Sequence, residues 1–249
     1  ALNWRDWTDL VVELAEWEVR LGDAEEPGLQ EALRTLQVSL RQDFARFIEQ
    51  RYVGWLAGSR ADRPPLSVDI VPEFVDPALR QHGKALLVVV DCLRLDQWEA
   101  IRPLISTRFD VETAYYYSIL PTATPFARNA IFSGLLPRAL ATRFPQWWKD
   151  QDENSLNAHE HMLLTRQLEE RYGRPVPVRY EKVFTATDGE SLLTRLPAHL
   201  AAEGVTALVF NFIDQLTHGR TENSTLFEVA RDTPALRSLT RTWFERSAL

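Results

Sequence analysis

Two short, continuous apolar runs, each followed by an aspartate, constrain the fold of this chain more than any other feature. Residues 85–90 read ALLVVV and precede Asp91, and residues 206–213 read TALVFNFI and precede Asp214. Runs of this length and composition are typical of parallel strands that are buried on both faces of a sheet. We therefore expect both runs to be buried strands, the first of them central, with both aspartates at strand ends.

Helical patterns alternate with strand-like segments along much of the chain. Residues 93–105, 159–172, 189–203 and 232–246 read as helices, and residues 111–119 and 177–184 read as further strands. This alternation predicts an α/β fold with a mostly parallel sheet and helices on both faces. No segment repeats at a fixed period, which argues against a solenoid.

The first 58 residues read as two helices. Apolar residues recur at three- and four-residue spacings before and after a break at residues 22–27, which predicts a helical hairpin. Residues 58–65 (GSRADRPP) read as a linker. We expect a helical arm at residues 1–60 and an α/β domain at residues 61–249. The apolar stripe at residues 36–55 would pack on the α/β domain or on a second copy of the chain.

Composition narrows the class of protein. The net charge of -7 argues against a bulk nucleic-acid surface or an anionic membrane surface, without excluding a small phosphate pocket. A single cysteine, Cys92, fits a reducing compartment. No apolar run reaches the roughly 18 residues of a membrane-spanning helix, and no signal peptide is evident. We expect a cytoplasmic protein, and the start at Ala1 suggests a piece of a longer one.

The segment LPTATPFARNAIFSG at residues 120–134 places Thr122 and Thr124 where an extended stretch gives way to a helix. Proline suits the first helical position, so Pro125 predicts Thr124 as the N-cap of a helix that ends near Gly134. A helix N-terminus offers free N–H donors and a partial positive charge to a phosphate group. Thr124 is therefore either a cap alone or a cap and a nucleophile.

The two aspartates carry the other chemistry. Ligands of open α/β sheets gather at the carboxyl ends of the strands, where Asp91 and Asp214 would converge. Asp91 is either a ligand or the cap of the next helix. His218 lies four residues after Asp214, so a helical turn would let both side chains grip one metal, for which zinc is suitable. The alternative is a surface Asp–His pair.

Three arginines lie close to these motifs. They are Arg94, Arg128 and Arg220. A guanidinium group matches a phosphate bidentately, so Arg94 and Arg128 are candidate substrate-binding residues. Each arginine has the alternative of a surface or ion-pair role.

Taken together, the motifs resemble the PglZ domain of the alkaline phosphatase superfamily, and most closely the response regulators of the PorX type that end in that domain. Residues 17–56 also resemble the linker helices of those regulators. The matching blocks are VVVDCLRLDQW (88–98), YYSILPTATPFARNAIFSGLLP (116–137), FNFIDQLTHGRTE (210–222) and RSLTRTWFERSAL (237–249).

The resemblance implies a site with two metal ions, usually zinc. Asp91 matches the metal-binding aspartate after the first strand, and Asp214 with His218 matches the Asp-x-x-x-His pair. Thr124 matches the nucleophile, which is also a metal ligand, because it is the second threonine of a PTxT motif ten residues before Gly134. The threonine alkoxide would attack phosphorus in line, and water would hydrolyse the phospho-threonine.

The resemblance also has departures. The family takes further ligands from a later Asp-His pair and a later histidine, which do not occur within this chain, and a receiver domain precedes the linker in its regulators. We therefore expect incomplete metal sites in this chain. The resemblance implies a phosphodiesterase or phosphatase output domain whose substrate is a phosphoester, with nucleotides among the candidates. The alternative is a non-catalytic signalling module that dimerises through residues 1–58 and binds a protein partner.

Overall fold

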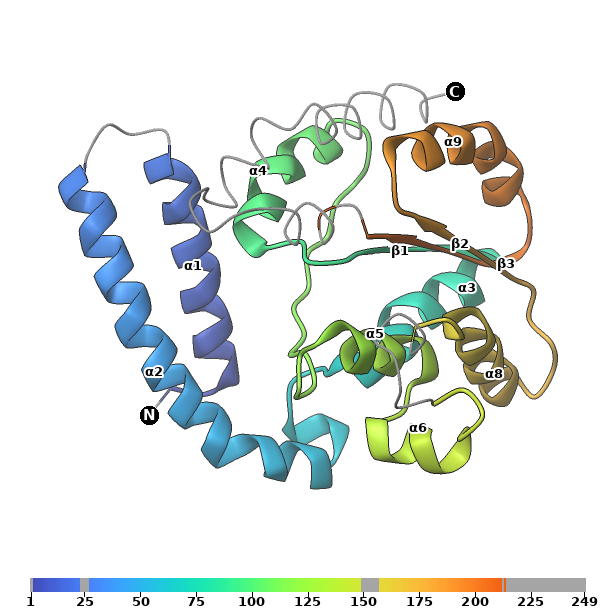
Figure 1. The fold of residues 1–249 in the computed structure, drawn as a ribbon, viewed down its shortest axis with the longest axis horizontal. Coiled ribbons are helices and arrows are strands. Elements are labelled where there is room, and N and C mark those ends of the chain that lie inside the picture. Colours follow the sequence, from blue (N-terminus) through green and yellow to red (C-terminus); the bar gives the residue numbers. More distant parts are fainter. Residues whose placement is uncertain (1, 23–26, 149–156, 212, 214–249) are drawn as a thin grey trace. The chain divides into compact units, whose positions relative to one another are not determined.

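The computed structural model describes residues 2–22, 27–148, 157–211 and 213 (Figure 1). Their contacts divide the chain into two compact units. The first unit contains the described residues up to Pro64 together with Leu93–Tyr115, and the second contains Pro65–Cys92 and the described residues from Tyr116 onwards. The boundary at Pro64 falls inside the predicted linker, and the segment after Cys92 groups with the N-terminal helices.

The first unit is helical. It contains α1 (Trp4–Gly22), α2 (Pro27–Ala57), a short 3₁₀ turn (Arg60–Asp62) and α4 (Leu95–Ser106). Helix α1 contacts both α2 and α4. A capping box starts α1: the Asp6 N–H donates to Asn3 Oδ1 at 3.3 Å, and the Asn3 N–H donates to Asp6 Oδ2 at 2.7 Å. The predicted N-terminal helical hairpin is confirmed.

Aromatic side chains hold α1 to α2. The ring of Trp7, which is buried, lies 5.3 Å from the ring of Phe44 and 5.9 Å from that of Phe47. Phe47 in turn contacts Trp55 at 5.7 Å. Such edge and tilted contacts add stability beyond the apolar area that they bury. Part of the apolar stripe of α2 is therefore used within the hairpin, whereas Val53 is 74% exposed.

A three-stranded parallel sheet forms the centre of the second unit. Its strands are β1 (Lys84–Val90), β2 (Val178–Val183) and β3 (Gly204–Phe210), in the order β1-β3-β2. Every residue of β3 is buried, whereas exposure alternates along β1. The prediction that residues 85–90 form a central, buried strand is wrong for the described sheet, where β1 lies at an edge and Leu86 and Val88 are exposed. An apolar run shows that a strand is partly buried, but not how many neighbours it has.

Helices cover both faces of this sheet (Figure 1). Helix α9 lies on one face, and α3, α5 and α8 lie on the other. The helical segments of this unit are a 3₁₀ turn (Ser67–Asp69), a π-helical turn (Val71–Val75), α3 (Asp76–His82), α5 (Thr124–Ser133), α6 (Pro137–Arg143), α8 (Glu160–Tyr172) and α9 (Ala186–Ala201). The predicted α/β class is confirmed.

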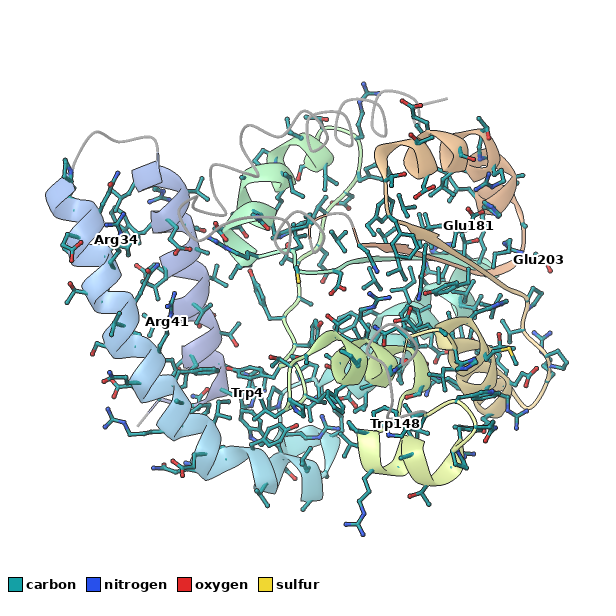
Figure 2. All side chains as sticks on the ribbon, in the orientation of Figure 1. Trp4, Arg34, Arg41, Trp148, Glu181 and Glu203 are labelled. Atoms are coloured by element: carbon teal, nitrogen blue, oxygen red, sulfur yellow. The ribbon has the colours of Figure 1, made fainter. Side chains whose placement is uncertain are left out.

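The main core of the second unit lies between the sheet and the helices on its α8 face. Side chains fill this space in Figure 2. Val205, Ala207 and Val209 of β3 point into it, because alternate residues of a strand share a face. Phe132 of α5 is fully buried in the same cluster. The remaining buried members are Val71, Val75, Leu79, Leu140, Leu163, Leu164, Leu168 and Val176.

The predicted strand at residues 111–119 is wrong. Apart from one isolated bridge between Leu66 and Tyr117, this stretch has no regular structure. The Tyr117 N–H donates to the Pro65 carbonyl at 2.8 Å, and the Ile119 N–H donates to Ser67 Oγ at 3.1 Å. The end of this stretch is thus bonded to residues 65–67 rather than to the sheet. The predicted helix at residues 232–246 lies outside the described residues.

Candidate active site at the carboxyl ends of the strands

Asp91 follows β1 directly and is mostly buried. Its N–H donates to the Phe210 carbonyl at 2.9 Å, which keeps it in register with the end of β3. Its side chain is 11% exposed. Cys92 then takes a left-handed conformation with φ 61°, which turns the chain away from the sheet. The carboxyl ends of parallel strands are where α/β proteins bind ligands.

Asp91 does not cap the following helix. The N-cap position of α4 is Arg94, whose N–H donates to the side-chain oxygen of Gln97 at 2.9 Å. The interpretation of Asp91 as a cap is therefore wrong.

The helix that carries Thr124 begins one residue earlier than the sequence suggested. The Ala123 carbonyl accepts the first helical bond, from the Ala127 N–H at 3.0 Å, so Ala123 is the N-cap and Thr124 is the first helical residue. The prediction of Thr124 as N-cap is wrong by this one position, because proline fits anywhere in the first turn of a helix. Thr124 is half-buried, and no side chain caps α5.

Glycine ends the same helix. Gly134 has φ 66° and its N–H donates to the Ala130 carbonyl at 2.9 Å. A Cβ atom at this position would lie 2.3 Å from the side-chain amide of Gln167 on α8, which is the end of a flexible side chain. The left-handed backbone is the feature that favours glycine here, and it confirms the predicted end of the helix.

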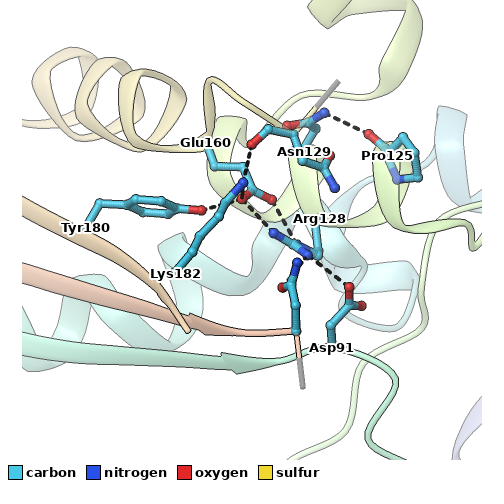
Figure 3. Close-up of polar contacts among 9 residues, drawn as sticks. Asp91, Pro125, Arg128, Asn129, Glu160, Tyr180 and Lys182 are labelled. Carbon is cyan, nitrogen blue, oxygen red and sulfur yellow. Dashed lines mark hydrogen bonds and ion pairs between the residues drawn. The ribbon is translucent and has the colours of Figure 1, made fainter. Parts of the chain in front are cut away.

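Arg128 lies one turn after Thr124 and connects α5 to two strands (Figure 3). Its Nη1 donates to Asp91 Oδ2 at 2.9 Å and to Asn211 Oδ1, beyond the end of β3, at 3.0 Å. Its Nε and Nη2 donate to the carboxylate of Glu160 at 2.8 and 2.7 Å. The Arg128 side chain is only 5% exposed, so these charge-assisted bonds form in a region that excludes water.

Glu160 is the centre of this buried network. It is fully buried at the start of α8, and besides Arg128 it accepts a hydrogen bond from the Tyr180 hydroxyl. Lys182 Nζ lies 3.2 Å from Glu160 Oε2 and donates to the Asn157 carbonyl at 2.6 Å. Figure 3 shows Tyr180, Lys182 and Arg128 converging on this one carboxylate.

Burial and charge both shift the pKa values in this network. Burial by itself lowers the pKa of Arg128, but the Glu160 and Asp91 carboxylates outweigh it and raise that pKa above its ordinary value. Burial raises the pKa of the Tyr180 hydroxyl strongly, and the charge of Glu160 raises it further. Arg128 is therefore a fixed cation and Tyr180 a fixed neutral donor.

The predicted site residues do not all lie in the same part of the structure. Arg128 joins Asp91 to the helix that begins with Thr124. Arg94 belongs to the first unit, where its guanidinium pairs with the buried Asp96 at 2.8 and 2.5 Å. The remaining candidates, Asp214, His218 and Arg220, lie outside the described residues.

Sequence reasoning missed the residues that surround Arg128. Glu160, Tyr180 and Lys182 lie in segments that read only as an ordinary helix and an ordinary strand. No motif or spacing marks them, since their partner Arg128 is distant in the chain. The one local signal is an acidic residue in the first turn of a helix, which is a common and unspecific feature.

Two of the predicted metal ligands, Asp91 and Thr124, lie among the described residues. Arg128 holds Asp91 Oδ2, and a carboxylate has a second oxygen that can bind a cation. Within residues 2–22, 27–148, 157–211 and 213, however, no group of three or more histidine, cysteine, aspartate or glutamate side chains could hold a metal ion. The described residues therefore contain no complete metal site, and the roles of Asp91 and Thr124 as metal ligands stay predictions.

Protein-family models match both parts of the chain. Residues 70–247 match the model of the BREX system PglZ alkaline phosphatase-like domain. Residues 1–56 match the PorX response regulator linker domain. A comparison with curated proteins found no significant match. In the part of the chain that the structure describes, no helix has both the length and the apolar character to cross a membrane.

Proposed function

The chain belongs to the PglZ alkaline phosphatase-like family and carries a PorX response regulator linker domain at residues 1–56. From this membership we propose that the chain is the phosphohydrolase output region of a response regulator. The substrate is a phosphoester, with diesters and nucleotides among the candidates. The response-regulator context also supports a cytoplasmic location. An alkaline phosphatase-like fold suggests metal ions in general, and zinc is the proposed one.

One contact supports this proposal best. Arg128 donates to Asp91 from the helix that begins with Thr124. Residues four apart on a helix lie on the same face, so Thr124 and Arg128 face the same side of α5. The contact therefore fixes the start of α5, which carries the proposed nucleophile Thr124, against the end of β1, which carries the proposed metal ligand Asp91. Catalysis requires reacting groups to be held in such defined positions.

Each residue then has a distinct task. Thr124 would attack phosphorus and displace the alcohol of the phosphoester, and the positive end of the α5 dipole would favour the negative charge of the phosphoryl group. Asp91 and Thr124 would hold one metal, and Asp214 with His218 would hold the other. Bound metals would lower the pKa of the threonine hydroxyl and neutralise the phosphoryl oxygens.

The two proposed substrate-binding arginines differ in how available they are. The Nε, Nη1 and Nη2 atoms of Arg128 all donate to protein oxygens, so a phosphate would have to share or displace one of them. Among the described residues, the Arg94 side chain pairs with the carboxylate of Asp96, and it is 37% exposed. Arg94 is the more exposed cation of the two, and a role in binding substrate is proposed for it as well.

Replacement of the nucleophile tests the proposal. The full-length protein with Zn²⁺ is expected to hydrolyse an aryl phosphodiester, and Thr124→Ala is expected to abolish turnover. Thr122→Ala is the matched control, because Thr122 lies two residues earlier and is exposed. Undiminished turnover in the Thr124 variant, with Zn²⁺ bound as in the wild type, would remove the nucleophile assignment.

A second candidate function is a dimeric signalling module that binds a protein partner. Its support is the hairpin of the first unit, where Leu36, Val38 and Val53 of α2 are exposed by 48%, 54% and 74%. Sedimentation of the protein with and without residues 1–58 tests an arm-mediated dimer. A monomer in both cases would contradict it, and the two functions are compatible.

A further inference from the structure

Arg128 has one positive charge and two carboxylate neighbours, Glu160 and Asp91, and its hydrogen bonds to the two differ in number and geometry. Glu160 receives two hydrogen bonds, at 2.8 and 2.7 Å, in a bidentate pair. Asp91 receives one hydrogen bond, at 2.9 Å, from Nη1 alone. A bidentate pair of a guanidinium and a carboxylate is stronger and more directional than a single bond. Glu160 is therefore the main electrostatic partner of Arg128.

Glu160 itself has no access to a substrate. Its side chain is 0% exposed, and it contacts the buried Arg128 and the half-buried Tyr180 and Lys182. Any influence of Glu160 on the reaction must therefore pass through another residue. That residue is Arg128, because its Nη1 donates to Asp91 and to Asn211, which follow the ends of β1 and β3.

We propose that Glu160 is a positioning residue that acts on Asp91 through Arg128. Glu160 takes up the charge of Arg128 and aims its Nη1 at Asp91 Oδ2. The negative charge of Asp91 and its second oxygen then remain available to a divalent cation. This inference rests on the metal-binding clause of the proposed function.

The charges in the network explain why the pairing matters. Glu160 and Asp91 carry two negative charges, and Arg128 and Lys182 carry two positive ones. Without the charge of Glu160, Asp91 would be the remaining carboxylate partner of Arg128, in surroundings that screen charge poorly. The guanidinium would then compete with a cation for Asp91. Loss of a group that supports a metal ligand typically weakens metal affinity by about 10–100-fold.

The test measures Zn²⁺ affinity rather than turnover. In the full-length protein, competition with a chromophoric chelator is expected to give at least about tenfold weaker Zn²⁺ binding for Glu160→Gln than for the wild type. The double variant Glu160→Gln/Arg128→Gln removes both charges of the bidentate pair. It is expected to recover most of the lost affinity, because no uncompensated guanidinium then faces Asp91.

Two further variants separate positioning from general damage to the fold. Lys182→Met removes the other cation beside Glu160, so it leaves Zn²⁺ affinity unchanged or raises it if Glu160 works through Arg128. Arg171→Gln is the matched control, because it breaks an ion pair to the buried Asp76 in the same unit without touching the network. It is expected to bind Zn²⁺ as the wild type does.

The outcomes are distinguishable. Unchanged affinity in Glu160→Gln overturns the inference, and so does a double variant that binds as weakly as the single one. If Glu160→Gln does not fold, the other two variants decide. Zn²⁺ binding by Lys182→Met that is weaker than that of the wild type overturns the inference. Zn²⁺ affinity equal to that of the wild type in both Lys182→Met and the double variant supports it. A wild type that binds no Zn²⁺ overturns the zinc clause of the proposed function together with this inference.

Discussion

The second unit contains two buried carboxylates, Asp76 and Glu160, that are bound by the same kinds of partner. Asp76, at the start of α3, pairs with Arg80 at 3.0 Å and with Arg171 at 2.7 Å, and it accepts a hydrogen bond from the Tyr172 hydroxyl at 2.6 Å. Glu160 also has two cations and one tyrosine hydroxyl. Both carboxylates join helices or strands that are distant in the sequence.

The two clusters differ in what lies beyond their cations. The arginines of Asp76 are 58% and 37% exposed, so water shares their charge and the cluster fastens α3 to the end of α8. Arg128 is 5% exposed and continues to Asp91 at the sheet edge. The cluster around Asp76 thus stabilises the packing of two helices. In our proposal, the similar cluster around Glu160 positions Asp91, a carboxylate of the active site. What separates them is burial of the cation.

The largest expected effect is the loss of the Glu160 charge. Glu160→Gln is expected to lower the free energy of unfolding by about 3 kcal/mol, because removing one member of a buried ion pair leaves the other without compensation. Urea denaturation followed by circular dichroism measures this. An unfolding free energy within experimental error of the wild type would show that burial of Arg128 does not strengthen its pairing with Glu160. The proposed difference between the Glu160 and Asp76 clusters would then be wrong.

The next effect is that of the Asp76 charge. Burial raises the pKa of Asp76, but the hydrogen bonds from Arg171, Tyr172 and Arg80 lower it from 3.8 to about 2. A carboxyl whose pKa is lower in the folded state stabilises the fold at pH above its unfolded pKa. Asp76→Asn is therefore expected to cost about 2 kcal/mol at pH 7, less than the Glu160 replacement.

The same linkage gives a pH dependence. The contribution of Asp76 is complete above pH 4 and is lost as the pH falls towards about 2, so wild-type stability decreases in that window. Denaturant titrations at pH 5, 4, 3 and 2 would follow it. The difference between the wild type and Asp76→Asn should shrink over this range, and a constant difference would contradict the assignment.

The tyrosine hydroxyls offer a smaller comparison. Tyr180→Phe is expected to cost about 1–2 kcal/mol, because its hydroxyl donates to a carboxylate that is fully buried. Tyr172→Phe is expected to cost about 1 kcal/mol or less, since the cations beside Asp76 remain in contact with water. Thermal unfolding of both variants would rank them, and the reverse order would contradict the contrast.

The smallest effect is expected for Arg171→Gln. The Arg171 side chain is 37% exposed and Asp76 keeps Arg80 and Tyr172, so the loss should be about 1 kcal/mol or less and should shrink further in high salt. Unfolding measured at low and high salt checks this. A larger loss that salt does not change would indicate that Arg171 is buried as effectively as Arg128.

Local sequence predicted much of the fold. The helical hairpin, the ends of α5 and α8 and the buried strand β3 follow from periodicity, glycine and proline, which act within a few residues. The errors concern partners at a distance. Residues 85–90 gave a strand at the edge of the described sheet, and residues 111–119 gave an extended loop, because the pattern of a single segment does not state what it pairs with.

The candidate site divides in the same way. Asp91 and Thr124 were identified from motifs, since a residue after an apolar run and a residue before a proline at a helix start are local features. Their assigned roles stay predictions. The hydrogen-bond partners of Arg128 could not be predicted, because Glu160 and Asn211 lie 32 and 83 residues away in the chain.

The sequence by itself determined the three strands of the described sheet and most of the helices, where α5 starts to within one residue, and which aspartate follows β1. Only the tertiary structure decided that Arg128 binds Asp91 and Glu160 together, and that Asp76 forms a similar cluster with more exposed cations. The physical reason is that backbone conformation depends mainly on neighbouring residues, whereas the strength of an ion pair depends on how completely distant segments exclude water from it.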